Sequence, residues 1–192
     1  MSDPKPARVF SLSETKHWGV GILWSDVGSF NFNAGQAPLL GLSAAHGTVL
    51  VQFTYTVQDG DGTIGTGMLS IVVNGVNTPP VAIGDEPDTP QGSRSEFYLR
   101  ADETTLIPAA LLLSNDYDPD VTDRIQGWPK VLGVHPTGAT RGSATLIDGA
   151  ITYDPRAVQA FQDLPAGEWM VDEFAYIITD AAGATDAAIA HV

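Results

Sequence analysis

The sequence predicts an all-β protein built from two β-sandwich modules in tandem, the first of them shortened. Apolar and polar residues alternate along short segments, turn residues separate these segments, and blocks of sequence occur twice. Alternation with a period of two is typical of strands that bury one face. Short strands separated by Gly, Asp and Asn turns are typical of sandwiches.

In the first half, the clearest strand runs from Val49 to Val57, where every second residue is apolar. The turn residues Asp59–Gly62 end it, and a second strand over Met68–Val73 completes a predicted hairpin. Earlier strands are expected at Arg8–Ser13, Gly19–Trp24 and Ser29–Asn33.

In the second half, a similar hairpin is predicted from Phe174, through a turn at Asp180–Gly183, to Val192. Further strands are expected at Glu96–Arg100, Lys130–His135, Ser143–Ile147 and Ala150–Tyr153. Helical patterns are scarce. Pro155–Leu164 is expected to form two helical turns with Asp154 as N-cap, and Pro108–Leu113 one turn.

The chain repeats itself at one constant offset. Phe53–Asp59 aligns with Phe174–Asp180, and Gly28–Asn33 aligns with Gly149–Asp154, both at 121 residues. Matching blocks at a single offset indicate two copies of one unit. We therefore predict a shortened module over residues 1–78 and a complete one over 79–192, joined near the stiff Pro79-Pro80 pair.

Composition excludes several classes of protein. The chain has no cysteine, which excludes a disulfide scaffold, a thiolate zinc site and a cysteine nucleophile. Its net charge is −14, so no nucleic acid partner is expected, because such partners need a basic face. No apolar run approaches the ~20 residues of a membrane span. The first residues lack a signal-peptide core, so any export signal is expected outside this chain.

Acidic side chains gather between residues 102 and 123, where no basic residue occurs. Asp116, Asp118 and Asp120 alternate with other residues in one loop, and calcium prefers such hard oxygen ligands. The alternative is a solvated acidic loop held by local turns. The Asp59–Gly62 turn is a weaker metal candidate, because Asp-Gly turns form hairpins without metal.

Three blocks resemble bacterial VCBS and cadherin-like tandem modules of large RTX-type surface adhesins. They are Phe53–Gly62 with the following Asn77-Thr-Pro-Pro80, then Leu106–Asp118, then Ile151–Tyr176. The resemblance implies an Ig-like Greek-key fold, calcium binding and a role as an extender or adhesive repeat without catalysis. It also places Asp85 and Glu103 at the same end of the sandwich as the acidic loop, as further calcium ligands. Thr78 departs from the family pattern, which has Asp there.

Three functions follow as hypotheses. The leading one is a non-enzymatic calcium-binding module of a secreted or cell-surface protein, next to other repeats of its own chain. The second is an adhesion domain that binds a surface glycan or protein through Trp18 and Trp24, although these residues also suit a core. The third is autoprocessing at an Asp-Pro bond such as Asp118-Pro119. No histidine pair or serine motif indicates any other catalysis.

Overall fold

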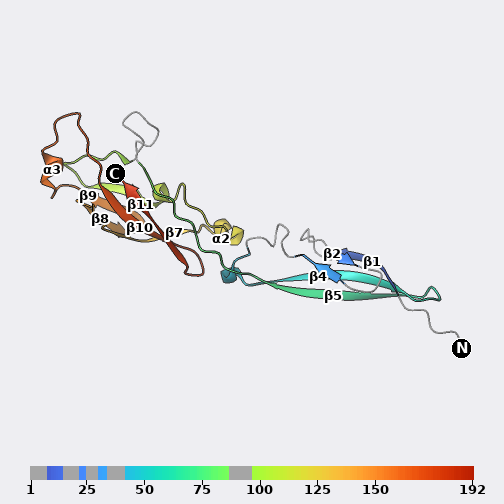
Figure 1. The fold of residues 1–192 in the computed structure, drawn as a ribbon. Coiled ribbons are helices and arrows are strands. Elements are labelled where there is room, and N and C mark those ends of the chain that lie inside the picture. The colour runs from blue at the N-terminus through green and yellow to red at the C-terminus, as the bar shows by residue number, and fades with distance from the viewer. Residues whose placement is uncertain (1–7, 15–21, 25–29, 34–41, 87–96) are drawn as a thin grey trace. The chain divides into compact units, whose positions relative to one another are not determined.

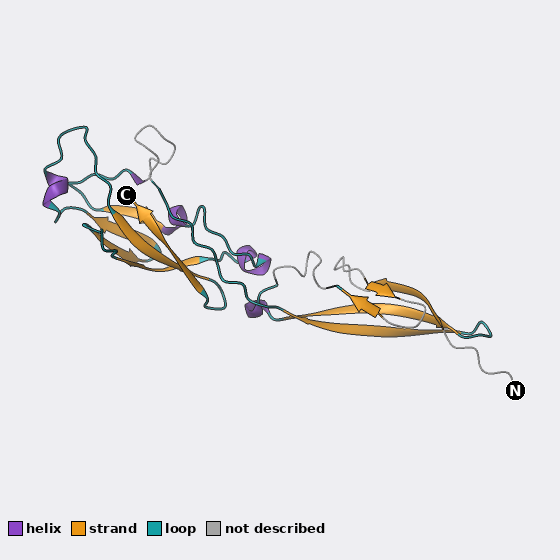
Figure 2. Ribbon diagram, in the orientation of Figure 1, coloured by secondary structure: helices purple, strands orange, loops and turns teal. Residues whose placement is uncertain are grey.

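A computed structural model describes residues 8–14, 22–24, 30–33, 42–86 and 97–192 (Figure 1). Its main elements are strands, as the sequence predicts, and its helices are single turns (Figure 2). The contacts divide the chain into two compact units. Unit 1 is Met1–Asn77 with Asp120–Thr122, and unit 2 is Thr78–Pro119 with Asp123–Val192.

Unit 1 contains an antiparallel sheet and a strand pair. The sheet has the order β1-β4-β5, and the pair is β2 with β3. Their bounds are β1 Arg8–Glu14, β2 Ile22–Trp24, β3 Phe30–Phe32, β4 Thr48–Gln58 and β5 Ile64–Asn74, with a short 3-10 turn η1 at Ala44–His46. Val51 and Phe53 of β4 are buried, and Phe53 meets Phe32 of β3 edge to face with ring centroids 6.4 Å apart. This contact packs the strand pair against the sheet.

Unit 2 is a sandwich of two antiparallel three-stranded sheets, ordered β11-β10-β7 and β6-β9-β8. The strands are β6 Thr105–Pro108, β7 Lys130–His135, β8 Ser143–Ile147, β9 Ala150–Asp154, β10 Glu173–Thr179 and β11 Thr185–His191. One core cluster contains Ile107 and Ile151 from one sheet and Phe174 and Ile178 from the other. Because both sheets bury their inner faces in a single cluster, they pack face to face.

The strands of the two units correspond at the offset found in the sequence. When 121 is added to their residue numbers, strands β1–β5 overlap strands β7–β11 in order. The order of strands in the sheets also corresponds: β1-β4-β5 matches β7-β10-β11, and β2-β3 matches β8-β9. The pair Phe53↔Leu69 corresponds to Phe174↔Ala190 in identical register. In each unit a register shift lies at the same point of the long strand, opposite β1 or β7.

Aromatic packing corresponds as well. Tyr153 of β9 stacks on Phe174 of β10 with centroids 6.4 Å apart, at the positions equivalent to Phe32 and Phe53. Tyr176 is fully buried, whereas its counterpart Tyr55 is half-buried. The strand β6 has no counterpart among the described residues of unit 1. The division of the chain into separate modules over residues 1–78 and 79–192 stays a prediction.

Two expectations about local structure were wrong. Residues 97–100 form no strand, although Phe97 is buried and Tyr98 exposed. The alternation there reflects burial of every second side chain in a segment that pairs with no strand. Asp154 is not a helix N-cap: its carboxylate binds the Arg156 side chain at 2.9 Å, and the helix α3 spans only Gln159–Gln162.

Two other helical turns frame the acidic loop. The predicted turn after Pro108 is present as α1 at Ala109–Leu112, and a second turn, α2 at Val121–Ile125, was not expected from the sequence. Within the described part of the chain, no helix has the length and apolar character needed to cross a membrane.

Candidate metal centre

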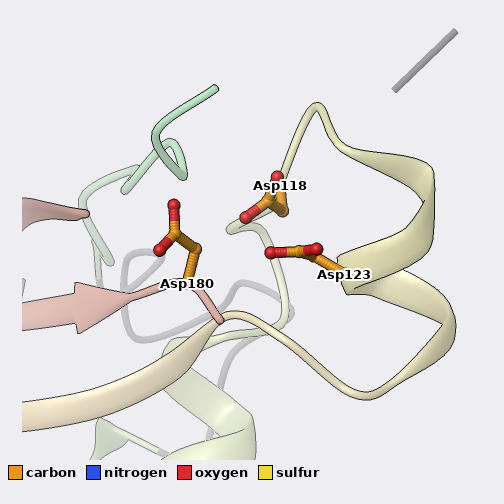
Figure 3. Close-up of side chains that lie close together, drawn as sticks. All are labelled: Asp118, Asp123 and Asp180. Atoms are coloured by element: carbon orange, nitrogen blue, oxygen red, sulfur yellow. The ribbon is translucent and has the colours of Figure 1, made fainter. Parts of the chain in front are cut away.

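Three aspartates of unit 2, Asp118, Asp123 and Asp180, form a compact acidic cluster (Figure 3). Each offers a carboxylate oxygen, and these oxygens lie within 4.8 Å of one another. All three residues are buried. Figure 3 shows their carboxylates turned toward a shared space. Below, these three residues are called the aspartate cluster.

Asp180 is oriented by the turn that follows β10. Its Oδ1 accepts hydrogen bonds from the backbone N–H groups of Ala182 and Ala184, at 2.9 and 2.8 Å. Gly183 has φ 89°, a left-handed conformation that glycine adopts without strain. The turn sequence therefore fixes the direction of the Asp180 carboxylate.

Asp118 lies in the loop before α2, and Asp123 lies within α2. Before Asp118, Tyr117 and Val81 form an isolated antiparallel bridge, with both backbone hydrogen bonds made at 2.8 and 3.2 Å. Asp123 lies in the first turn of α2, and its Oδ2 accepts a hydrogen bond from the N–H of Ala181 at 3.3 Å. This hydrogen bond connects α2 to the β10–β11 turn beside the aspartate cluster.

The chemistry of the aspartate cluster favours a hard cation. Carboxylates at this separation repel one another, and burial strengthens the repulsion because water no longer screens it. Calcium takes about 6–8 oxygen ligands at 2.3–2.6 Å. Three carboxylates supply three or more of them, and backbone carbonyls or water supply the rest. Divalent charge also offsets the cost of burying the acids.

Of the predicted ligands, only Asp118 belongs to the aspartate cluster. Asp116 is half-buried, and its Oδ1 accepts hydrogen bonds from the Ile83 N–H at 2.7 Å and the Tyr176 hydroxyl at 3.2 Å. Burial raises the pKa of Asp116. Asp85 is also buried. Burial raises the pKa of the Tyr176 hydroxyl, and the negative charge of Asp85 raises it further.

The other two predicted ligands lie elsewhere. Glu103 is exposed and pairs with Arg100 at 3.3 Å. Asp120 is buried but groups with unit 1 by its contacts. Of the three aspartates that alternate along the loop, Asp118 belongs to the aspartate cluster, whereas Asp116 and Asp120 do not.

Asp123 and Asp180 belong to the aspartate cluster but were not among the predicted ligands. Asp180 ends a buried strand 57 positions after Asp123, so no sequence spacing connects them. Its counterpart in the repeat is Asp59, whose Oδ1 accepts from Asp61 and Thr63 at 3.0 and 2.8 Å in the same kind of turn. Asp59 is exposed and lies in unit 1. The same turn is therefore exposed to solvent after β4, whereas after β10 its aspartate lies beside Asp118 and Asp123.

The predicted tryptophan platform falls largely outside the described structure. Trp18 lies among residues that the structure does not describe, and Trp24 belongs to β2, where only the backbone is described. The predicted platform of these two side chains therefore stays a prediction.

Comparison with known proteins connects this geometry to a family. Residues 77–192, which are 116 of the 192 residues, match the family described as bacterial Ig domain. The matched region contains both sheets of unit 2 and the whole aspartate cluster. The search of curated proteins found no match.

Proposed function

Because the chain belongs to the bacterial Ig domain family, we propose that it is a non-enzymatic, calcium-binding module of a secreted or cell-surface protein. Bacterial Ig-like domains are often extracellular, and the family suggests an adhesion or repeat-type role. Ig-like all-β folds are typically non-enzymatic, since their function lies in surfaces and loops rather than in a catalytic cleft.

The observation that carries the calcium proposal is the aspartate cluster. A calcium ion there binds the loop that holds Asp118, the helical turn that holds Asp123, and the β10–β11 turn that holds Asp180. It joins segments that are distant in sequence and neutralises charge that opposes their approach. Its expected role is structural: it stiffens one end of the sandwich.

A narrower assignment, to extender repeats of the VCBS or cadherin-like type in RTX-type adhesins, is also a proposal. It is supported by the correspondence of β1–β5 with β7–β11 at one offset, because extender regions are built from repeated units. In this proposal, neighbouring repeats of the same chain are the natural partners of each module.

Thermal unfolding of the full chain tests the calcium proposal. Binding to the native state alone adds about 2.7 kcal/mol at a hundredfold excess of ligand over Kd, so millimolar calcium should raise the melting temperature of unit 2. A chelator should reverse the rise. Asp118→Ala should abolish most of the response.

Asp59→Ala is the matched control, because Asp59 makes the same turn hydrogen bonds as Asp180 but is exposed in unit 1. This variant should keep the full calcium response. A melting temperature that calcium leaves unchanged, together with no binding heat in calorimetry, would refute the proposal. An equal loss of response in both variants would mean that calcium acts through total charge instead.

A further inference from the structure

A second candidate site lies in unit 2, at the opposite end of the β10–β11 hairpin from the turn that holds Asp180. Asp172 and Val192 close that end with two backbone hydrogen bonds of 2.9 Å. Both residues line a cavity of about 770 Å³. Pockets for small ligands and peptide side chains typically measure ~300–1,000 Å³, so the cavity is large enough for either. None of its lining residues belongs to the aspartate cluster.

The walls of the cavity are mostly apolar. Phe97 and Phe161 are buried, and Leu99 and Leu164 are partly buried. At the rim, three consecutive apolar side chains are exposed: Trp169 at 56%, Met170 at 39% and Val171 at 37%. Contiguous exposed apolar side chains beside a cavity are typical of a binding surface.

The polar groups of the walls are largely engaged already. The Gln162 side-chain amide donates to the Ala101 carbonyl at 2.6 Å. The Asp172 carboxylate accepts from the Tyr153 hydroxyl at 2.6 Å and from the Gly142 N–H at 2.7 Å. A carbohydrate needs many hydrogen-bonding partners around its ring. These walls favour an apolar group over a sugar.

The charge of the lining is negative. Glu86, Asp102 and Glu168 line the cavity with Arg100, the one basic residue of the described lining. Arg100 is paired with Asp102 through contacts of 2.8 and 3.0 Å, and with Glu103 at 3.3 Å. Its charge is therefore neutralised, while Glu168 and Glu86 are exposed, and Glu86 contacts Nδ1 of His191 at 3.2 Å. This arrangement attracts cationic ligands and repels anionic ones.

We propose that the cavity binds an extended peptide segment of a partner protein that places an apolar side chain against Trp169 and Met170 and a neighbouring Lys or Arg against Glu168 and Glu86. Apolar anchors in a pocket with charged groups at the rim are a common mode of peptide recognition. The peptide site is independent of the calcium proposal, because the two sites share no residue.

NMR titration of the isotope-labelled full chain tests this inference. The probes are the peptides Gly-Lys-Phe-Lys-Gly, Gly-Glu-Phe-Glu-Gly and Gly-Lys-Ser-Lys-Gly, and the neutral sugar cellohexaose. The first peptide should shift the Trp169 indole and Met170 methyl signals. It should bind at least about tenfold more tightly than Gly-Lys-Ser-Lys-Gly, which lacks the apolar anchor, and than Gly-Glu-Phe-Glu-Gly, whose charges are repelled by the acidic lining.

Variants then locate the site. Trp169→Ala should weaken binding at least about tenfold, and Glu168→Gln should weaken it measurably and reduce its salt dependence. The matched controls are Leu132→Ala, an exposed apolar residue of β7, and Asp148→Asn, an exposed acid beyond β8. Both lie outside the cavity lining and should bind like the parent protein.

Three results would overturn the inference. If cellohexaose shifts the same signals and the peptides do not, the cavity is a sugar site. If no probe at millimolar concentration moves the Trp169 or Met170 signals of the folded protein, or if the control variants lose binding as much as Trp169→Ala, the cavity is not a peptide site. Circular dichroism of every variant confirms that it remains folded.

Discussion

Replacing Asp172 with alanine should destabilise unit 2 strongly, because one buried carboxylate serves three donors. Oδ1 accepts from the Arg141 N–H at 2.9 Å, and Oδ2 accepts from the Gly142 N–H at 2.7 Å and the Tyr153 hydroxyl at 2.6 Å. Asp172 and Tyr153 are both buried. A buried donor left without a partner costs about 1–3 kcal/mol, and the two N–H groups are only partly buried, so we expect a total loss of about 3–5 kcal/mol.

A conservative variant separates the contributions. Tyr153→Phe removes one donor and leaves the carboxylate with its two backbone partners, so the expected loss is about 1.5–3 kcal/mol. In the double variant Tyr153→Phe with Asp172→Ala, the phenol no longer lacks a partner. The double variant should therefore cost less than the sum of the single variants, by about 1–2 kcal/mol.

Hydrogen exchange in the full chain is the appropriate assay. The chain has two units, and a chain of more than one unit often does not unfold in a single two-state transition. The slowest amides of β9 and β10 report the opening of unit 2 by itself. If Asp172→Ala lowers their opening free energy by less than about 1 kcal/mol, or if the two single costs simply add, the carboxylate is not the shared acceptor that we describe.

Three further predictions concern unit 2. Burial raises the pKa of Tyr153, helped by Asp172, and the pKa of Tyr176, helped by Asp85, so both keep their protons at a pH where the unfolded chain loses them. The unfolded state then binds fewer protons, and thermal unfolding above pH ~10 should show stability falling by up to about 1.4 kcal/mol per pH unit for each tyrosine; a flat profile to pH 11 would contradict the burial. Gly142→Ala should cost about 1–3 kcal/mol in a denaturant titration, because its Cβ would lie 2.5 Å from the Tyr153 hydroxyl, whereas Gly138→Ala, with nothing within 4 Å, should be nearly neutral; equal costs would refute the clash. Phe174→Ala should cost about 3–5 kcal/mol by the same titration, and a cost below about 1 kcal/mol would place it outside the core.

Strands with regular alternation between turn residues could be predicted closely from the sequence. β7 and β8 begin and end at the predicted residues, Lys130–His135 and Ser143–Ile147. The burial of β8 alternates along its whole length, because the strand faces the core on one side only. The alternation in β7 breaks at Gly133 and Val134, next to the register shift in its pairing with β10. The internal repeat was equally informative. Because its offset is constant at 121 residues, it indicates both the order of the strands and which residues pair between them.

Short elements and the site itself were harder to predict. β6 has four residues, too few for alternation to stand out, and it is recognised only through its pairing with β9. The segment at Tyr98–Arg100 shows the converse, because alternation reports burial and not ladder hydrogen bonds. Sequence spacing identified Asp118 but not Asp180, since the cluster depends on where β10 ends in space.

The most direct test of the account is a crystal structure of the full chain grown in millimolar calcium. We expect one calcium ion with carboxylate oxygens of Asp118, Asp123 and Asp180 at about 2.3–2.6 Å, identified by its anomalous scattering. Crystals of Asp180→Asn should show that ion lost or weakened, while Asp59→Asn should keep it. Saturating calcium with no ion among these three carboxylates, or with the ion bound by Asp116 and Asp85 instead, would contradict the account.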